Sequence, residues 1–279
     1  MWLGVARERA FFSALIAGAI LLGACDEDAE GSGGESETGA GAGQADAAST
    51  AGPGPAATTG ASTGIGAGPH VAAHGLSFYR YGETGAASID SPPLDTRAAG
   101  STLVVSTGRG DLSTVALPTD SFGNSSALLG SPHAYTLWPT SGTAVHAFED
   151  VLGGPGHVVS SPTASHDEIT LAVVEVAGAT RVADVQWVER LAGSPLTSAP
   201  VTTTRPSTLV AFWWGDAGVD GEKIATPNNG FVVLDSIGEP GSLVQCFVAA
   251  KDVAEPGTHD VTWEATPAQG AQLWLVAVE

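Results

Sequence analysis

From His70 to its last residue the sequence consists of short apolar runs separated by Gly, Pro, Asn and Asp, and this pattern most constrains the fold. Short runs rich in β-branched and aromatic residues, bounded by turn formers, are typical of strands. No part of the region keeps a 3.6-residue hydrophobic period free of Gly and Pro, so little helix is expected. The pattern predicts an all-β domain.

We expect about a dozen strands in this region. They are predicted at residues 76–81, 102–106, 134–138, 143–148, 157–160, 169–176, 184–189, 208–214, 231–234, 243–250, 260–266 and 271–278. Many short strands with close turn signals favour a two-sheet β-sandwich of the jelly-roll or immunoglobulin-like type.

Two hydrophobic patterns distinguish the layers of such a domain. Val261, Trp263 and Ala265 alternate with polar residues, which predicts a strand with one wet face on the outside of a layer. Residues 169–174, 209–214 and 273–278 are apolar on both faces. Such strands are central and covered on both sides, or have one face against another partner.

A short internal repeat hints at two related halves. The tetrad Ser101–Val104 recurs as Ser207–Val210. Four residues are too few to establish a duplication.

The formal net charge of −20, from 30 acidic and 10 basic residues, argues against nucleic acid as a partner and against binding to anionic headgroups. The chain has two cysteines, Cys25 and Cys246. If Cys25 is modified, no internal disulfide can form, and Cys246 within an apolar strand is expected to be a buried, inert thiol.

Residues 1–24 have the layout of an export signal, with Arg7 and Arg9 before an uncharged run from Ala10 to Gly23. This run is shorter than the roughly 20 apolar residues that a spanning helix requires. We therefore expect a peptidase to remove it rather than a permanent membrane span.

The run ends in Leu22, Gly23, Ala24 and Cys25, which resembles the lipobox of bacterial lipoproteins. The resemblance implies cleavage before Cys25, diacylglycerol on its sulfur and acylation of the new amine, giving a membrane anchor. The alternative is an ordinary signal peptide with a chance cysteine. Asp26 resembles the inner-membrane retention signal of enteric lipoproteins, whereas the long tether that follows favours the outer membrane or the cell surface.

That tether, residues 25–69, carries seven acidic residues and no basic ones among mostly Gly, Ala, Ser and Thr. Such a composition cannot bury enough apolar area to offset chain entropy, so a disordered linker is expected. The folded domain is then residues 70–279.

Several short motifs within this domain point to a family. They are "GSTLVV" from Gly100, "TDSFGN" from Thr119, "LAVVEVAG" from Leu171 and the closing "AQLWLVAV". Together they resemble a family of secreted bacterial β-sandwich domains. The resemblance implies an accessory module of surface or carbohydrate-active proteins, without assigned chemistry.

The candidate ligand-binding residues surround two adjacent tryptophans. Trp213 and Trp214 share a predicted strand and so point to opposite faces. Either one ring is exposed, forming with the loop residues Asp216, Asn228 and Asn229 a stacking platform for a sugar or protein, or both rings are buried.

Other chemistries have weaker signals. Asp216, Asp220 and Glu222 are weak calcium candidates because they share a Gly-containing loop. The cluster His166, Asp167 and Glu168 is interpreted as a solvated turn, so no metal site is expected. Paired carboxylates for glycoside hydrolysis have candidates at Glu149, Asp150, Glu175 and Glu189. No catalytic triad, phosphate loop or cofactor motif is recognised.

The sequence thus predicts a lipid-anchored envelope protein that displays a non-enzymatic β-sandwich binding a glycan or an envelope protein. Two alternatives remain open. One is a carbohydrate-active hydrolase with paired loop carboxylates, and the other is a purely structural envelope lipoprotein.

Overall fold

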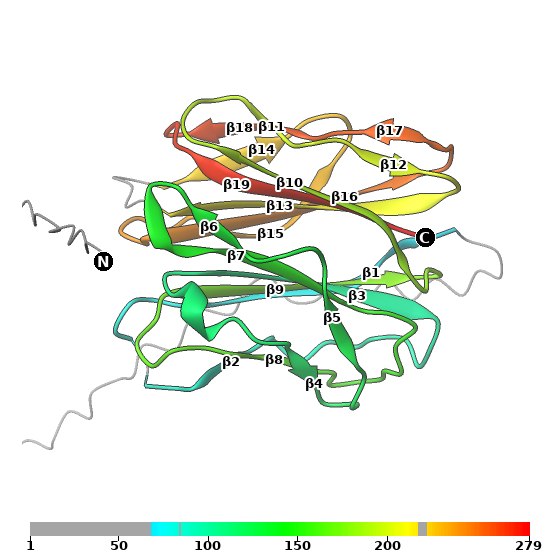
Figure 1. Cartoon of the computed structure of the whole chain (residues 1–279). Coiled ribbons are helices and arrows are strands. Elements are labelled where there is room, and N and C mark those ends of the chain that lie inside the picture. Colours follow the sequence, from blue (N-terminus) through cyan, green and yellow to red (C-terminus); the bar gives the residue numbers. More distant parts are fainter. Residues whose placement is uncertain (1–67, 84, 217–221) are drawn as a thin grey trace, which may run out of the picture. The chain divides into compact units, whose positions relative to one another are not determined.

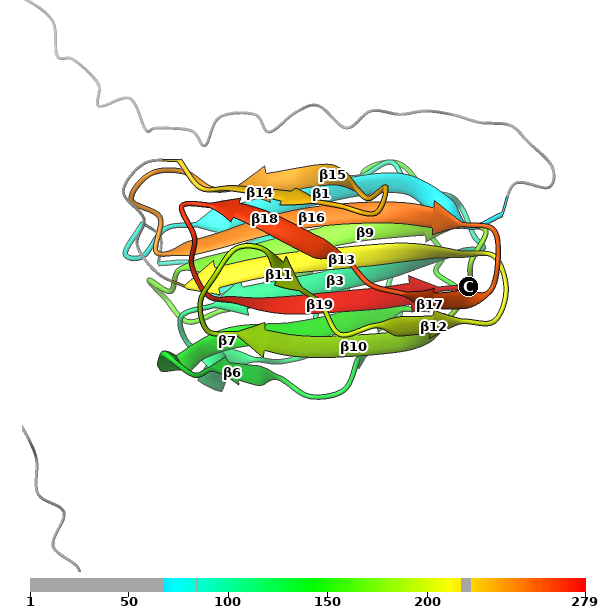
Figure 2. The same cartoon turned by 90° about the horizontal axis from the view of Figure 1, so that it is seen from above.

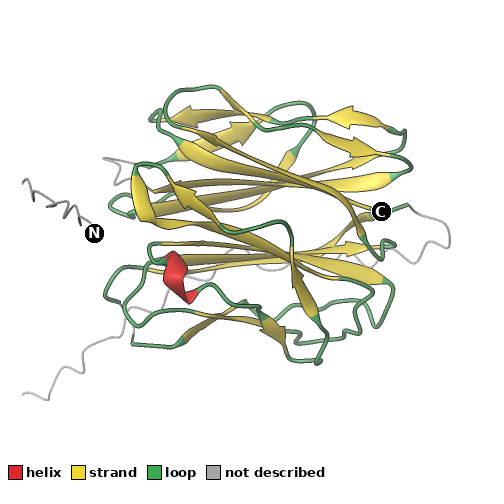
Figure 3. Ribbon diagram, in the orientation of Figure 1, coloured by secondary structure: helices red, strands yellow, loops and turns green. Residues whose placement is uncertain are grey.

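Nineteen strands, paired antiparallel in five sheets, form the part of the chain that the computed structural model describes, residues 68–83, 85–216 and 222–279 (Figure 3). All of these residues belong to one unit, Gly52–Glu279. The helix in this part is a single 3-10 turn, η1 (Leu112–Thr114). The all-β prediction is confirmed; the signal segment, Cys25, Asp26 and the linker up to residue 67 lie outside the described residues, as does Asp220.

The first large sheet comes from the N-terminal half of the described chain. Its order is β1–β9–β3–β7–β5, with β6 also paired to β7. The strands are β1 (His70–Tyr79), β3 (Ser101–Arg109), β5 (Ser126–Leu128), β6 (His133–Tyr135), β7 (Trp138–Phe148) and β9 (Ile169–Ala177).

The second large sheet comes from the C-terminal half, in the order β10–β19–β13–β16–β15. Its strands are β10 (Val182–Arg190), β13 (Ser207–Asp216), β15 (Val232–Ile237), β16 (Val244–Val253) and β19 (Ala271–Val278). Its edge strand β15 lies near the edge strand β1 of the first sheet, where His74 Nδ1 lies 2.7 Å from an Asp235 carboxylate oxygen.

Three small sheets cover the outer faces of the two large ones (Figures 1 and 2). On the first sheet lie β2 (Ser88–Asp90), β8 (Val159–Pro162) and β4 (Thr119–Asp120). On the second lie β11 (Leu196–Thr197), β18 (Thr262–Thr266) and β14 (Ile224–Pro227), and the pair β12 (Val201–Thr203) and β17 (Gly257–His259). The described chain therefore has four layers, and the prediction of only two sheets is wrong.

Three apolar clusters hold these layers together. The central cluster joins the large sheets through residues such as Val104, Val174, Val210 and Val276. A second cluster lies under β11, β18 and β14, and a third lies under β2 and β8. Because β9, β13 and β19 each lie between two clusters, they are buried along almost their whole length, as their two-sided apolar sequences predicted.

The two halves follow one topology. In each half, the strand that comes first in the sequence (β1 or β10) forms an edge of the large sheet. The strand that comes last in the sequence (β9 or β19) pairs with it, and the central strand of the sheet (β3 or β13) pairs with that last strand. These central strands, β3 and β13, begin with the repeated tetrad Ser101–Val104 and Ser207–Val210.

A shared irregularity strengthens the correspondence between the halves. The edge strands β1 and β10 each shift register after their first paired residues, between Val71 and Ala73 and between Val182 and Asp184. The two large sheets thus correspond in strand order and in the register shift of an edge strand, and not only in the repeated four residues.

Candidate functional site

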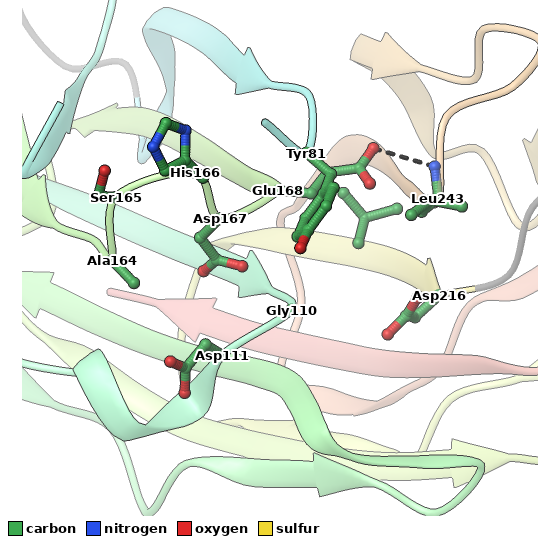
Figure 4. Close-up of a pocket in the computed structure, with 11 residues that line it drawn as sticks. Tyr81, Gly110, Asp111, Ala164, Ser165, His166, Asp167, Glu168, Asp216 and Leu243 are labelled. Carbon is green, nitrogen blue, oxygen red and sulfur yellow. Dashed lines mark hydrogen bonds between the residues drawn. The ribbon is translucent and has the colours of Figure 1, made fainter. Parts of the chain in front are cut away.

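A pocket of about 410 Å³ opens where the ends of the two large sheets meet (Figure 4). The first sheet contributes Asp111, just beyond β3, and Asp167 and Glu168, just before β9. The second contributes Asp216 at the end of β13 and Val244 at the start of β16. The pocket therefore combines segments from both halves of the chain.

Backbone hydrogen bonds fix the loop of residues 164–168, which carries five of the eleven pocket residues. Gly110 N donates to Glu168 O at 3.0 Å, and Gly82 N donates to His166 O at 3.0 Å. His166 itself has a φ of 69°, a left-handed conformation that few side chains adopt. Asp167 and Glu168 follow this turn directly and are both buried.

Four carboxyl groups line the pocket: Asp111, Asp167, Glu168 and Asp216. Asp167 is 7% exposed and Glu168 is 3% exposed. Glu168 Oε1 accepts a hydrogen bond from Leu243 N at 2.9 Å. Asp167 Oδ2 and Glu168 Oε2 are buried with no hydrogen-bond partner. A buried acceptor without a donor is costly, so these two oxygens are the least satisfied atoms of the pocket.

Burial raises the pKa of Glu168 to about 7, and the nearby Asp216 adds to the effect, while the amides of Leu243 and Val244 oppose it. Burial also raises the pKa of Asp167 and that of Asp216. By contrast, hydrogen bonds from Ser113 hold the pKa of Asp111 below its usual value. The pocket thus contains carboxyl groups whose environments separate their titrations.

The nearest buried cation, Arg109, has other partners. Its guanidinium donates to Thr114 Oγ1, Ser161 Oγ and the carbonyl of Pro162, at 2.9 to 3.1 Å. Among the described residues that line the pocket, none is Lys or Arg. The four carboxyl groups therefore have no cationic side chain within the pocket.

Tyr81 lies at the rim, in the turn after β1, and is 74% exposed. Glu168 and Leu243 line the same pocket as Tyr81 (Figure 4). A free aromatic ring next to carboxylates is the combination that sugar-binding sites use, with stacking on the ring and hydroxyl bonds to the acids.

The tryptophans do not form such a platform. Trp213 and Trp214 point to opposite faces, as predicted, but both are buried, at 0% and 1% exposure. Trp214 belongs to the central cluster and Trp213 to the cluster under β18. The structure selects the alternative in which both rings are core, and the exposed-tryptophan hypothesis is wrong.

Of the loop residues predicted beside the tryptophans, the structure brings Asp216 into the pocket but not Asn228 or Asn229. Those two form the turn after β14. Asn228 Oδ1 accepts from Thr262 N at 2.9 Å, and Asn229 Nδ2 donates to Asp260 at 3.1 Å. Their contacts stabilise the outer sheet.

The described residues contain no cluster that would bind calcium or another metal ion. Of the calcium candidates, Asp216 lies in the pocket, Glu222 is exposed, and Asp220 is outside the described residues. No group of three or more His, Cys, Asp or Glu side chains is arranged to hold a metal within the described ranges. Asp167 and Glu168 are buried, which corrects the interpretation of this segment as a solvated turn.

The carboxylates proposed from sequence for hydrolysis have structural partners instead. Glu149, Glu175 and Glu189 accept backbone hydrogen bonds from Val182, Arg97 and Thr136, at 2.7 to 2.8 Å. None of them, nor Asp150, lines the pocket.

One buried hydrogen-bonded chain was not anticipated. His157 Nε2 lies 2.8 Å from Asp120 Oδ2, and its Nδ1 lies 2.9 Å from Thr96 Oγ1. Thr96 Oγ1 also accepts from Gly154 N at 3.0 Å, so this hydroxyl is part of the loop's own bonding. Cys246 is buried, as predicted, and burial raises the pKa of its thiol to about 12.

No family model, curated protein or solved structure matches this chain. Within the described ranges, no helix has the length and apolarity needed to cross a bilayer.

Proposed function

We propose that this chain is a lipid-anchored protein of the bacterial envelope whose all-β domain binds a glycan, without chemical conversion, in the pocket between the sheet ends. The membrane part of the proposal comes from the lipobox-like residues that end in Cys25. The likeness to secreted bacterial β-sandwich modules, of jelly-roll or immunoglobulin-like type, supports a binding role.

The observation that carries the ligand-binding part is the pairing of a free aromatic ring with buried acceptors. Tyr81 has an exposed face, and Asp167 and Glu168 each have a buried carboxylate oxygen without a hydrogen-bond partner among the described residues. A sugar satisfies both, because its C–H face stacks on the ring and its hydroxyls donate to the acids.

The test is capture of the full chain, held in detergent, on an array of bacterial glycans. Tyr81→Ala is the informative variant because the ring is 74% exposed and its loss leaves the core intact. Trp138→Ala is the matched control, an aromatic 56% exposed that does not line the pocket. We expect Tyr81→Ala to abolish capture and Trp138→Ala to preserve it; equal capture by both variants would refute the proposed site.

The second candidate, a glycoside hydrolase, gains support from the same carboxyl groups. Glu168, with a pKa raised to about 7 by burial, suits a general acid, and Asp111, with a lowered pKa, suits a base or nucleophile. Release of reducing sugar from a captured glycan, abolished by Glu168→Gln, would favour this candidate over simple binding.

A further inference from the structure

The pocket atoms without hydrogen-bond partners indicate which chemical groups the bound sugar carries. Asp167 Oδ2 and Glu168 Oε2 are both acceptors, buried and without a donor. Two more carboxyl groups, Asp111 and Asp216, line the same pocket. A complementary ligand must therefore supply N–H or O–H donors, and positive charge is favoured over neutrality.

The protein supplies positive charge to this pocket only from residues outside its lining, Arg109 near Asp167 and Asp111 and Arg80 near Glu168. Arg109 donates through its two terminal nitrogens to Thr114, Ser161 and Pro162, while its charge acts on Asp167 and Asp111 from outside the pocket. Arg80 pairs with the Glu239 carboxylate, and neither residue lines the pocket. The described lining of the pocket thus holds four carboxyl groups and no cationic side chain.

Gly110 lets the Asp167 carboxylate approach the backbone closely. Asp167 lies against Gly110, where an added β-carbon would be 2.8 Å from Asp167 Oδ1. Figure 4 shows the Asp167 carboxylate directed toward Asp111 and Gly110, inside the ring of lining residues. A side chain at position 110 would occupy the space beside this carboxylate.

We propose that the ligand carries a protonated primary amine, which donates to Asp167 and Glu168 while the rest of the sugar stacks on Tyr81. This inference rests on the proposed glycan-binding function and names its ligand class as an amino sugar with a free amine. The recognised group is a charged ammonium with N–H donors, so a quaternary ammonium, which has no N–H, and an N-acetylated sugar, which has a single neutral amide N–H, should bind less tightly.

The test is calorimetric titration of the full chain in detergent with glucosamine, N-acetylglucosamine, glucose and ethylamine. We expect glucosamine to bind at least about tenfold more tightly than glucose or N-acetylglucosamine, with ethylamine in between. Asp167→Asn and Glu168→Gln should each weaken glucosamine binding by roughly ten- to hundredfold, and the exposed Glu264→Gln should not.

A proton readout separates recognition of the charge from loss of folding. At pH 6 the amine is protonated, and Glu168 largely keeps its proton because its pKa is about 7. Binding should therefore release protons from the wild-type chain, seen as heats that differ between buffers, and release fewer from Glu168→Gln.

Each outcome decides between the two proposals. Glucose binding as tightly as glucosamine would overturn the amine inference and leave glycan binding standing. Ethylamine binding with no sugar bound would keep the amine and refute the glycan. No binding by any of the four probes would overturn the amine inference, whereas capture on the array would still test the glycan proposal.

Discussion

The indole of Trp214 lies so close over Gly108 that a β-carbon added to the glycine would fall 2.0 Å from Trp214 Nε1. The two residues occupy the same position in the two halves, each eighth in a central strand that begins Ser-Thr-Leu-Val. The largest and smallest side chains thus face each other between the large sheets.

Gly108→Ala should therefore destabilise the domain by about 1–3 kcal/mol, because the new methyl group overpacks a filled core. Trp214→Phe should relieve part of this cost, so the double variant should be less destabilised than the sum of the singles. Urea unfolding of all four chains measures the coupling. Simple additivity would contradict the contact.

A second prediction concerns pH and Glu168. Burial raises its pKa from 4.5 to about 7, so the folded state holds this proton more tightly than the unfolded state. Its contribution to stability is full below about pH 4.5 and falls as pH rises toward 7. Glu168→Gln does not titrate, so its free energy of unfolding should rise by about 1–3 kcal/mol relative to that of the wild type over this interval.

The measurement is the variant-minus-wild-type difference in unfolding free energy from pH 4.5 to 7.5. Taking the difference matters because burial lowers the pKa of His146 to about 4, which makes stability rise with pH over much of the same range. Glu264→Gln is the exposed control. A flat difference for Glu168→Gln would show that its carboxyl group is not buried in the folded protein.

Glu279 titrates in the opposite direction. Burial acts to raise its pKa, but hydrogen bonds from Thr204, Arg205 and Arg181 outweigh burial and hold the pKa at about 2. Its stabilisation is present above about pH 4.5 and is lost as pH falls toward 2.

Glu279→Gln should accordingly cost about 1–3 kcal/mol at pH 7 and much less near pH 2. Unfolding at both pH values measures this change. An equal cost at the two values would mean that packing, not charge, accounts for the role of Glu279.

The burial pattern of the longer strands could be predicted from sequence, although the number of sheets could not, because hydrophobic periodicity follows burial. Val261, Trp263 and Ala265 are buried and their neighbours are not, as the alternation on β18 indicated. The seven unpredicted strands, β2, β4, β5, β11, β12, β14 and β17, have two to four residues each. Such segments are too short to show a period, and tertiary pairing alone makes them strands.

One predicted strand, residues 134–138, was only partly right, because Ala134 and Tyr135 belong to β6 and Trp138 begins β7. Its residues are apolar enough for a strand, but Thr136 and Leu137 form the turn between β6 and β7. Thr136 donates its backbone N–H to Glu189 at 2.8 Å. A contact from so distant a residue leaves no trace in the local pattern.

The pocket could be predicted only in part. Asp216 was predicted as a binding residue, but only because it follows Trp213 and Trp214 in the sequence, and these two are core residues. Asp167 and Glu168 look like a surface turn because their burial depends on Gly110 and Leu243, which lie far away in the chain. Only the topology brings these segments together.

The envelope location has its own test. Cys25→Ser should move the protein from the membrane fraction to the soluble fraction, because serine has no sulfur to carry the lipid. Each methylene of an acyl chain contributes about 0.8 kcal/mol to membrane binding, so loss of two or three chains removes the anchor. Mass spectrometry of the wild-type chain should find the mature form starting at a lipidated Cys25. An unmodified thiol there would refute the anchor.

The most direct measurement on the central claim is a carbon-13 NMR titration of the side-chain carboxyl groups with glucosamine. We predict saturable shifts at Glu168 and Asp167 and an unchanged signal at Glu264. Uniform drift of every acidic signal, or none at the two pocket residues, would contradict the assignment of this pocket as the binding site.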